Sequence, residues 1–397
     1  MTPFDRPQRI ARLGAAAFVT LLLLFACGKH ESPTNGGTPP SVVIHSPGAG
    51  DTLSGIGFTV TGIASDEEGI AAIRLKADGM TFATTTASPF SLYFPAFLFD
   101  AGAIDILVEA EDTDGAKGSA SVGATLAERA LRSIGSAADQ EREPAFSPDG
   151  NTIVFTSEGT SGNRDLYTVS ASGGAAALLA SSSVEDISPD WSPNGLWIAF
   201  ASNRSANWDV WTVPAGGGAE TRISTSGAAD RGPVWSPNGA RIAFHSNRDG
   251  NWNLYAVLVS NGEPSGAEEA YTAAATVESS ATWRSDGDVL AFVSNQVGGS
   301  DLSTVQPPGP ILTLVPGAND PMAREIDPAF CPKGPYLVFA DNRNGQYDIW
   351  AVDPASGRKK ILASHIADDR EPAWSPRGNR IAFASNRGGT YDIWILE

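Results

Sequence analysis

Residues 371–394 read EPAWSPRGNRIAFASNRGGTYDIW, and the same pattern is written six times between Glu141 and Glu397. Each copy has a lead aromatic residue, a turn, a phenylalanine nine positions later, and a short apolar strand opened by an acid or amide. The lead aromatic residues are 44 to 48 positions apart: Phe146, Trp191, Trp235, Trp283, Phe330 and Trp374. The phenylalanines are Phe155, Phe200, Phe244, Phe292, Phe339 and Phe383. Repetition at this period, with several short strands per unit and no long helical pattern, predicts an all-β, six-bladed propeller with about four strands per blade.

A proline stands two positions before the lead aromatic residue in five of the six copies: Pro144, Pro189, Pro233, Pro328 and Pro372. Proline cannot donate to a strand ladder, so it is placed at sheet edges. We therefore expect the strand of the lead aromatic residue to be the innermost strand of each blade, beside the central channel.

The chain ends on a third strand, YDIWILE (391–397), with no fourth strand after it. The segment Ala130–Ile134 has the pattern of a fourth strand but precedes the first copy. We expect these two segments to pair and close the ring, which removes an open sheet edge.

The copies GPVWSPNGARIAFHSNRDGNWNLY (232–255) and EPAWSPRGNRIAFASNRGGTYDIW (371–394) resemble the repeats of the TolB-like (PD40-type) propeller family, whose signature is PxWSPDGxxIAFxSxRxGxxDIW. The resemblance covers residues 129–397 and implies the propeller fold. It implies little about function, because one fold serves many functions. The family's namesake has an α/β domain before its propeller, whereas this chain has a β-rich segment there.

An acid stands five positions before every lead aromatic residue: Glu141, Asp186, Asp230, Glu278, Glu325 and Asp369. Arginines recur after the second strand, and propeller topology brings the two sets to one face: Arg204, Arg248, Arg343 and Arg387. The set is either a charged ring that grips a cationic partner or metal, or a set of ties within and between blades. Repetition in every blade favours ties, because a ligand rarely needs six equivalent grips.

Function is then expected where the copies differ, and the fourth copy differs most. The candidates for a binding face are Arg142, Asp186, Asp190, Arg231, Glu278, Arg284, Gln296 and Arg370. Loops and departures of this kind on a rigid scaffold commonly carry binding. His245 is expected to pack between blades, and Cys331 replaces a serine of four other copies.

No catalytic motif is present: the sequence lacks GxSxG, HExxH, a P-loop and GxGxxG before a helix. We therefore expect no catalytic residues, no cofactor and no metal, and a scaffold that binds an envelope protein. The alternative is a propeller that binds or cleaves glycans, since acids far apart in sequence can converge only in the fold.

The first residues predict export. Arg6, Arg9 and Arg12 precede an apolar run from Leu13 to Ala26, too short to span a bilayer comfortably but typical of a signal peptide. The run ends LFAC, which resembles a bacterial lipobox, so Cys27 is the expected lipidation site. The expected location is the bacterial cell envelope, lipid-anchored at the outer membrane and facing the periplasm or the surface. An ordinary signal peptide with a chance cysteine is the alternative.

We divide the chain into a signal peptide (1–26), a flexible linker (27–40), an Ig-like β-sandwich (41–127) and the propeller (128–397). The sandwich is predicted from about seven alternating segments, among them FSLYFPAFLF (90–99), and it looks like the Ig-like modules of bacterial surface proteins. Its Asp112, Asp114 and Asp66–Glu68 are either calcium ligands or turn residues, and the weak DxDG spacing favours turns.

The net charge of the chain argues against polyanionic partners. After removal of residues 1–26 the chain has 24 basic and 44 acidic side chains, a net charge of −20. Nucleic acid and anionic lipid both require a basic face. Expected contact with the membrane is therefore through the lipid anchor, with a protein as the partner and a polysaccharide as the alternative.

Overall fold

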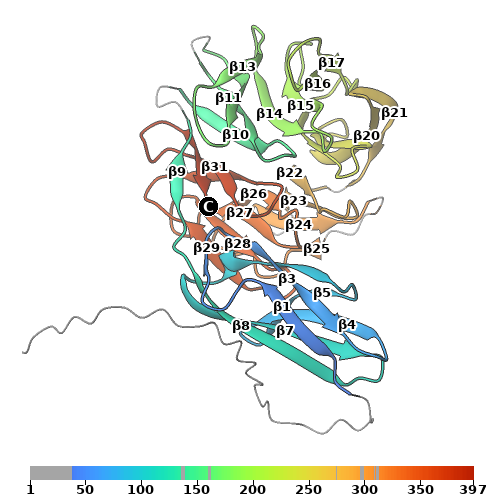
Figure 1. The fold of residues 1–397 in the computed structure, drawn as a ribbon. Helices are drawn as coiled ribbons and strands as arrows, with labels where there is room; N and C mark the ends of the chain where they lie inside the picture. Colours follow the sequence, from blue (N-terminus) through green and yellow to red (C-terminus); the bar gives the residue numbers. More distant parts are fainter. Residues whose placement is uncertain are drawn as a thin grey trace, which may run out of the picture.

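The computed structural model describes residues 38–397 except 136–138, 160–161, 274, 296–298, 308 and 310–312. The predicted signal peptide, Cys27 and the linker up to residue 37 lie outside the described residues. The described part consists of strands and one short 3-10 helix, and it contains no helix with the length and hydrophobicity needed to cross a membrane. Two β-structures follow one another along the chain, the smaller one below the larger in Figure 1.

The first structure is a sandwich of two sheets. Strand order in the three-stranded sheet is β1 (Ser41–Ser46), β3 (Phe58–Ser65) and β6 (Phe90–Phe94). Strand order in the five-stranded sheet is β2 (Thr52–Leu53), β8 (Lys117–Leu126), β7 (Gly102–Asp112), β4 (Ile70–Ala77) and β5 (Met80–Thr85). Alternate residues of β4 and β7 point inward, and Ile73, Leu75 and Ile106 are fully buried between the sheets.

One predicted strand is shorter than expected. The segment 90–99 is a strand only to Phe94, and after Pro95 it turns into the 3-10 helix η1 (Ala96–Leu98). Pro95 lacks the N–H that a ladder needs, which ends the pairing. The apolar side chains after it are then free to pack elsewhere.

The second structure is a propeller of six four-stranded sheets, each ordered from the channel outward. The first three blades are β10 (Glu141–Phe146), β11 (Thr152–Ser157), β12 (Asp165–Ser170), β13 (Ala177–Ala180); β14 (Asp186–Trp191), β15 (Trp197–Ser202), β16 (Asp209–Pro214), β17 (Thr221–Arg222); and β18 (Asp230–Trp235), β19 (Arg241–Ser246), β20 (Asn253–Ser260), β21 (Glu263–Ala270).

The other three blades complete the ring. They are β22 (Glu278–Trp283), β23 (Leu290–Ser294), β24 (Asp301–Val305), β25 (Thr313–Leu314); β26 (Glu325–Phe330), β27 (Leu337–Asp341), β28 (Asp348–Val352), β29 (Lys359–Ala363); and β30 (Asp369–Trp374), β31 (Ile381–Ser385), β32 (Asp392–Leu396), β9 (Leu131–Ser133).

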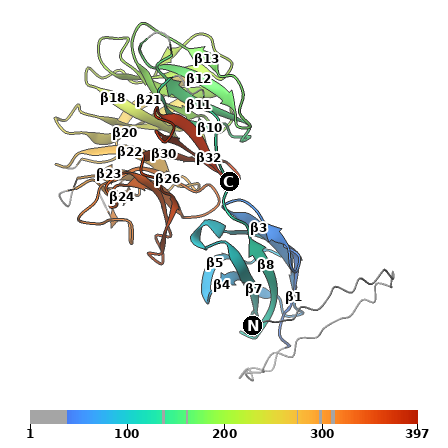
Figure 2. The ribbon, with the colours of Figure 1, turned by 90° about the vertical axis from the view of Figure 1, so that its left-hand side faces the viewer.

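The innermost strands β10, β14, β18, β22, β26 and β30 each contact the next, and β30 contacts β10, so the ring is closed. Figure 2 shows the blades arranged around this ring of innermost strands. The repeated phenylalanine lies on the second strand of every blade and is at most 1% exposed in all six. The six-fold motif is thus the core of the propeller, as the sequence predicted.

The last blade closes as expected, by pairing the two ends of the propeller segment. Trp394, Ile395 and Leu396 of β32 lie opposite Ser133, Arg132 and Leu131 of β9. The N–H of Ala130 donates to the carbonyl of Glu397 at 2.7 Å, and the reverse bond is 2.9 Å. The pairing covers the edge of β32 and makes β9 the outermost strand of this blade.

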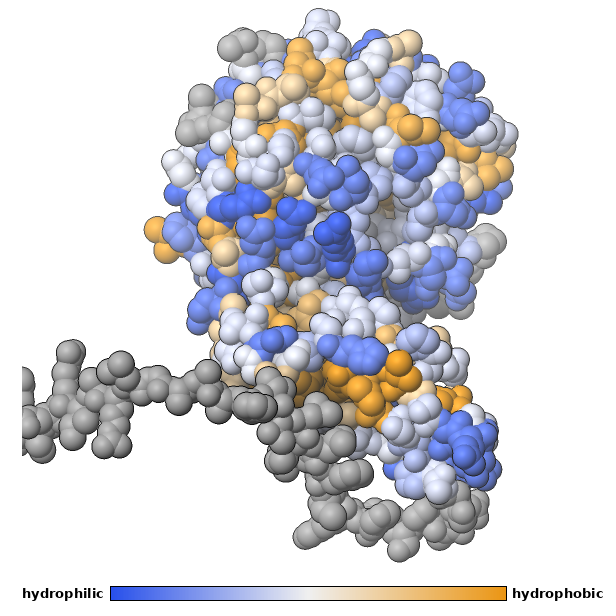
Figure 3. Space-filling view, viewed as in Figure 1, coloured by the Kyte–Doolittle hydropathy of each residue, from blue (hydrophilic) through white to orange (hydrophobic). Residues whose placement is uncertain are grey.

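The sandwich packs against blades five and six through an apolar interface. The Phe97 ring lies 5.4 Å from the ring of Tyr336 and 5.2 Å from that of Trp374. The Tyr93 hydroxyl donates to the carbonyl of Gly378 at 2.6 Å. Buried residues of both structures form one continuous hydrophobic cluster. Figure 3 shows hydrophobic surface gathered on the sandwich close below the propeller.

Candidate binding site on the loop face

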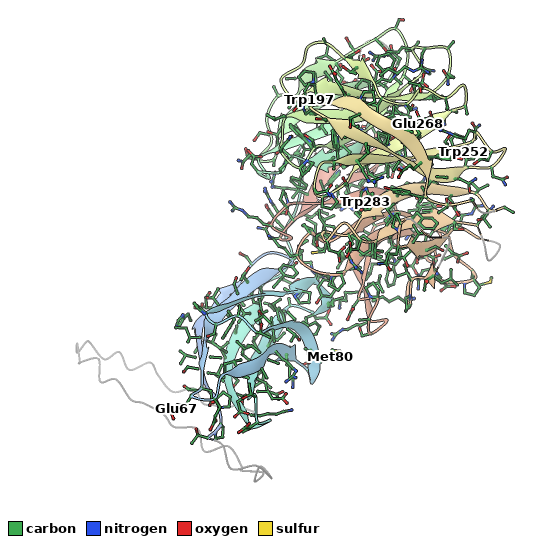
Figure 4. The ribbon with its side chains drawn as sticks, turned by 90° about the vertical axis from the view of Figure 1, so that its right-hand side faces the viewer. Glu67, Met80, Trp197, Trp252, Glu268 and Trp283 are labelled. Carbon is green, nitrogen blue, oxygen red and sulfur yellow. The ribbon has the colours of Figure 1, made fainter. Side chains whose placement is uncertain are left out.

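The propeller has two faces. The loop face is the side formed by the loops between the second and third strands of each blade and by the connections between blades. The turn face is the opposite side, which carries the turns between the first and second strands. Figure 4 labels Trp252 on the loop face and Trp197 on the turn face. The sandwich contacts turns such as Asn379 and strand ends on the turn face, so it leaves the loop face open.

The repeated acids of the loop face are ties. All six are at most 1% exposed. Asp186 accepts two bonds from Arg204 at 2.7 and 2.8 Å, and Asp369 accepts two from Arg387 at 2.7 and 2.6 Å. Asp230 forms an ion pair with Arg248 at 3.1 Å. Such charge-assisted bonds hold the entries of blades two, three and six to their own second-to-third-strand loops.

Two acids expected on a binding face therefore have another role. Asp186 is fully buried in its tie to Arg204, and Glu278 is fully buried and accepts bonds from the hydroxyls of Thr272 and Thr276. Neither carboxylate faces solvent. The physical reason is that an acid repeated in every blade has a structural role common to all blades, which is to hold the loops around it in place.

Three arginines that follow the acid in only some copies form a different group. Their guanidinium groups lie over aromatic rings: Arg142 over Tyr391 at 4.1 Å, Arg231 over Trp208 at 4.3 Å, and Arg370 over Tyr347 at 4.1 Å. Arg231 is also 5.9 Å from the Trp252 ring. We name this group the collar; its members are Arg142, Arg231, Arg370, Trp208, Trp252, Tyr347 and Tyr391.

The three collar arginines differ in their charge partners. Arg142 forms an ion pair with Glu371 at 2.5 Å, and Arg370 forms one with Asp368 at 2.9 Å. Arg231 takes part in none of the ion pairs found among the described residues, and its Nε–H has no hydrogen-bond partner. Burial and the nearby charge of Arg164 lower the pKa of Arg231. An anion at this position would relieve both effects.

Below the collar, each innermost strand carries a β-bulge at the same place. The bulged residue has a φ between 49° and 58° and lines the channel in all six blades: Glu143, Ser188, Gly232, Ser280, Asp327 and Glu371. Residues other than glycine rarely adopt this backbone conformation, which is held here by the neighbouring blades.

The bulged acids join adjacent blades. Glu371 accepts the backbone N–H of Glu143 at 2.8 Å, and Glu143 accepts the N–H of Ser188 at 2.8 Å and its hydroxyl at 3.1 Å. Asp327 accepts the Ser280 hydroxyl at 3.3 Å. Three blades thus place carboxylates on one side of the channel, while the bulged position of each of the other three blades has a small residue.

The channel is a cavity of about 400 Å³ with two further titratable groups in its wall. Burial raises the pKa of Asp190 to about 7, although the N–H groups of Trp235 and Trp191 favour its charged form. Burial and the charge of Glu371 raise the pKa of Asp327 to about 7. Burial also lowers the pKa of His245 to about 4. These walls can therefore hold protons near neutral pH.

His245 differs from its expected place between blades. It lines the channel, with its ring 5.2 Å from that of Trp252 and its Cε1 beside Gly232, where an added Cβ would come within 2.6 Å. The glycine of this bulge leaves room for the imidazole.

Two candidates of the fourth blade do not join the collar. Arg284 lies in the turn after β22, on the turn face, where it pairs with Asp286 at 2.6 Å. Gln296 lies outside the described residues. The structure brings together Arg142, Arg231 and Arg370 on the loop face, with Asp190 in the channel wall beneath them.

A polar hollow of about 470 Å³ adjoins the collar on the loop face. Its walls include Arg142 and Tyr391 of the collar and the ion pair of Arg164 with Glu185 at 2.5 Å. Both charge signs are present, so the surface beside the collar suits a polar protein segment more than an apolar ligand.

Sequence reasoning missed the aromatic half of the collar. Each of its four rings directly precedes the acid or amide that opens a third strand: Asp209, Asn253, Asp348 and Asp392. Aligning the copies at that acid would have found these rings. The bulged acids had a signal too, since Glu143, Asp327 and Glu371 each precede an inner-edge proline.

Comparison with known proteins agrees with this fold. Residues 115–232 match a family model described as TolB beta propeller domain, and residues 40–124 match one described as Bacterial Ig domain. Both matches agree with the predicted order of a TolB-like propeller after an Ig-like domain.

Solved structures are similar at low identity. TolB from Acinetobacter baumannii has a TM-score of 0.53 at 19% identity, over 85% of this chain and 82% of that one. A putative TolB from Agrobacterium tumefaciens has 0.52 at 17%, over 67% and 96%. A gluconolactonase from Xanthomonas campestris has 0.53 at 10%, over 68% and 89%. Likeness at this level concerns the fold alone.

Proposed function

We propose that this protein is a non-catalytic scaffold of the bacterial cell envelope, which binds a partner protein through the collar on its loop face. One observation carries the proposal: Arg231 lies beside two tryptophan rings at the channel mouth without a charge partner. Arg, Trp and Tyr are the residue types that dominate the energy of protein interfaces. The collar consists of these three types.

The partner should present a carboxylate to Arg231. A guanidinium binds a carboxylate through two parallel bonds, and the aromatic walls exclude water that would weaken the pair. The tie arginines, such as Arg204 and Arg387, are already paired and are not available for this role. The specific group is therefore an Asp or Glu side chain, or a chain terminus, of the partner.

A photo-crosslinking experiment tests the proposal. Benzoylphenylalanine replaces Trp208 in the collar of the full chain expressed in its native host. The matched position is Leu196 on the turn face of the same blade, which is 63% exposed. We expect one protein adduct from position 208 that is absent from position 196.

The charge requirement has its own control. Arg231→Ala should lower the adduct yield and weaken binding of the identified partner about tenfold or more, the loss typical of an interface hot spot. Arg284→Ala removes an arginine from the opposite face and should leave binding unchanged. Equal effects of the two substitutions, or adducts equal at both positions, would count against the collar as the interface.

The envelope location is proposed from the TolB-like fold and from the exported N-terminus predicted by the sequence. Cys27 is the proposed lipidation site, and the outer membrane the proposed anchor. Cys27→Ala should then release the protein from membranes into the soluble envelope fraction. Membrane association that persists in this variant would overturn the anchor.

Glycan binding or cleavage is the second candidate. It is favoured by two carboxyl groups in one channel, Asp190 and Asp327, whose pKa values are raised to about 7, as general acids require. Incubation with envelope polysaccharides should then give saturable binding or new reducing ends, lost in Asp327→Asn. Silence across the whole panel would remove this candidate and leave the protein partner.

A further inference from the structure

We propose that Asp66, Glu68 and Asp112 form a calcium site at the end of the Ig-like sandwich far from the propeller. Asp66 and Glu68 lie in the loop after β3, and Asp112 is the last residue of β7. One carboxylate oxygen from each lies within 4.8 Å of the other two. Figure 4 labels Glu67 of this loop, at the opposite end of the sandwich from the propeller.

Asp112 supplies the main observation. Its side chain is 1% exposed, and its Oδ1 accepts the N–H of Asp114 at 2.9 Å and of Ala116 at 2.8 Å. Its Oδ2 is buried and has no hydrogen-bond partner. A buried carboxylate oxygen without a partner costs folding free energy unless a positive charge compensates it.

Among the residues that the structure describes, no side chain supplies that charge. Other acids of the same sandwich are paired: Glu109 with Lys76 at 2.9 Å and Glu111 with Arg74 at 2.6 Å. By contrast, the ion pairs of the described residues include none of Asp66, Glu68, Asp112 and Asp114. The cluster lacks a cation.

The geometry suits calcium. Calcium binds six to eight oxygen ligands at about 2.3–2.6 Å, so ligands on opposite sides of the ion lie about 4.6–5.2 Å apart. Carboxylates within 4.8 Å of one another can therefore share one ion after small side-chain movements. Backbone carbonyls and water would complete the shell. Magnesium needs a smaller, near-octahedral shell and should bind less well.

The proposed site lies close to the start of β1, where the described chain enters the sandwich. Ser41 at the start of β1 pairs with Ser65, directly before Asp66. Gly118 leaves room for the Pro40 carbonyl, which an added Cβ would approach to 1.8 Å. A bound ion would thus fix the loop beside the point where the described chain enters the sandwich.

Calorimetric titration tests the site. The full chain is stripped with EDTA, dialysed and titrated with calcium chloride alone. We expect one site with a Kd of about 10⁻³ M or tighter, as in extracellular modules, and an upward shift of the unfolding midpoint with calcium. Magnesium chloride should give a weaker response.

Substitutions then locate the ion. Glu68→Gln changes an exposed side chain and should weaken binding at least tenfold, while the neighbouring Glu67→Gln should leave Kd within about twofold. Asp112→Asn keeps the Oδ1 acceptor, so it should fold and lose binding. The absence of saturable binding up to about 10 mM calcium, or equal Kd values for the Glu67 and Glu68 variants, would overturn the proposal.

Discussion

At the scale of single residues, the six bulged positions divide the channel into two halves. Glu143, Asp327 and Glu371 come from blades one, five and six, and the glycine and two serines come from the other three. Arg231 belongs to blade three, on the side with small residues. An anionic group entering the mouth would therefore meet Arg231 away from the three bulged carboxylates, which would repel it, and Asp190 of blade two is the acid on the Arg231 side. This asymmetry gives the collar a direction that six-fold repetition alone lacks.

Asp190 predicts a dependence of stability on pH. Burial raises the pKa of its folded-state carboxyl to about 7, above the value near 3.9 of an unfolded chain. The folded state therefore binds more protons, and stability falls as pH rises from about 4 to about 7. Asp190→Asn resembles the protonated form and should be more stable than wild type at pH 8, by on the order of 4 kcal/mol, but not at pH 4.

Thermal unfolding at both pH values measures this difference. The exposed Asp105→Asn in the sandwich is the matched control and should show no gain between pH 4 and pH 8. If the Asp190 variant tracks wild type at both pH values, Asp190 is charged in the folded protein at neutral pH and the channel wall stabilises its anion.

Predictions from single residues were correct where the residue has the same structural role in every blade. The six phenylalanines are buried as predicted, because each fills the same place between adjacent blades. The alternative of ties for the repeated acids is confirmed for the same reason. The collar was half found: its arginines stand out as departures from the repeat, but its aromatic residues look like ordinary strand residues. Their role depends on which blade lies next in space.

At the scale of elements, β9 decides whether the ring is closed. It pairs with β32 across more than 250 positions of sequence, and the Arg132 side chain adds an ion pair with Glu397 at 3.0 Å. The sequence predicted this pairing because the last copy lacks a fourth strand and the segment before the first copy supplies one. A propeller favours this pairing because closure satisfies strand edges that are otherwise exposed.

Ala130→Pro tests the closure. Ala130 is exposed, so its side chain contributes little, but its N–H donates to the Glu397 carbonyl at 2.7 Å. Proline removes this donor and should destabilise the propeller by about 1–2 kcal/mol, seen as a lower unfolding midpoint. Ala130→Ser keeps the N–H and should behave as wild type. Equal midpoints for the two variants would mean that closure begins only at β9 itself.

At the scale of the whole molecule, the sequence predicted two structures but not how they meet. The segment 90–99 looks like one apolar strand, and only the break at Pro95 turns Phe97 toward the propeller. The contacts join residues far apart in sequence, such as Tyr93 and Gly378. Periodicity identifies a buried face within each structure, but it contains no information on which two surfaces bury one another.

Phe97 should hold the two structures together, and Phe97→Ala tests this at the level of the molecule. Phe97 is fully buried, and removing its ring from Tyr336 and Trp374 should cost about 3–5 kcal/mol. We expect one calorimetric transition for wild type and two for this variant. Trypsin should also cleave faster after Arg129, whose guanidinium donates to the carbonyls of Phe97 and Phe99 at 3.0 and 2.7 Å. Phe90→Ala removes an equally buried ring without a ring contact to the propeller. It should lower the sandwich's stability without exposing Arg129 in the native protein, so equal cleavage of the two variants would show that the interface does not depend on Phe97.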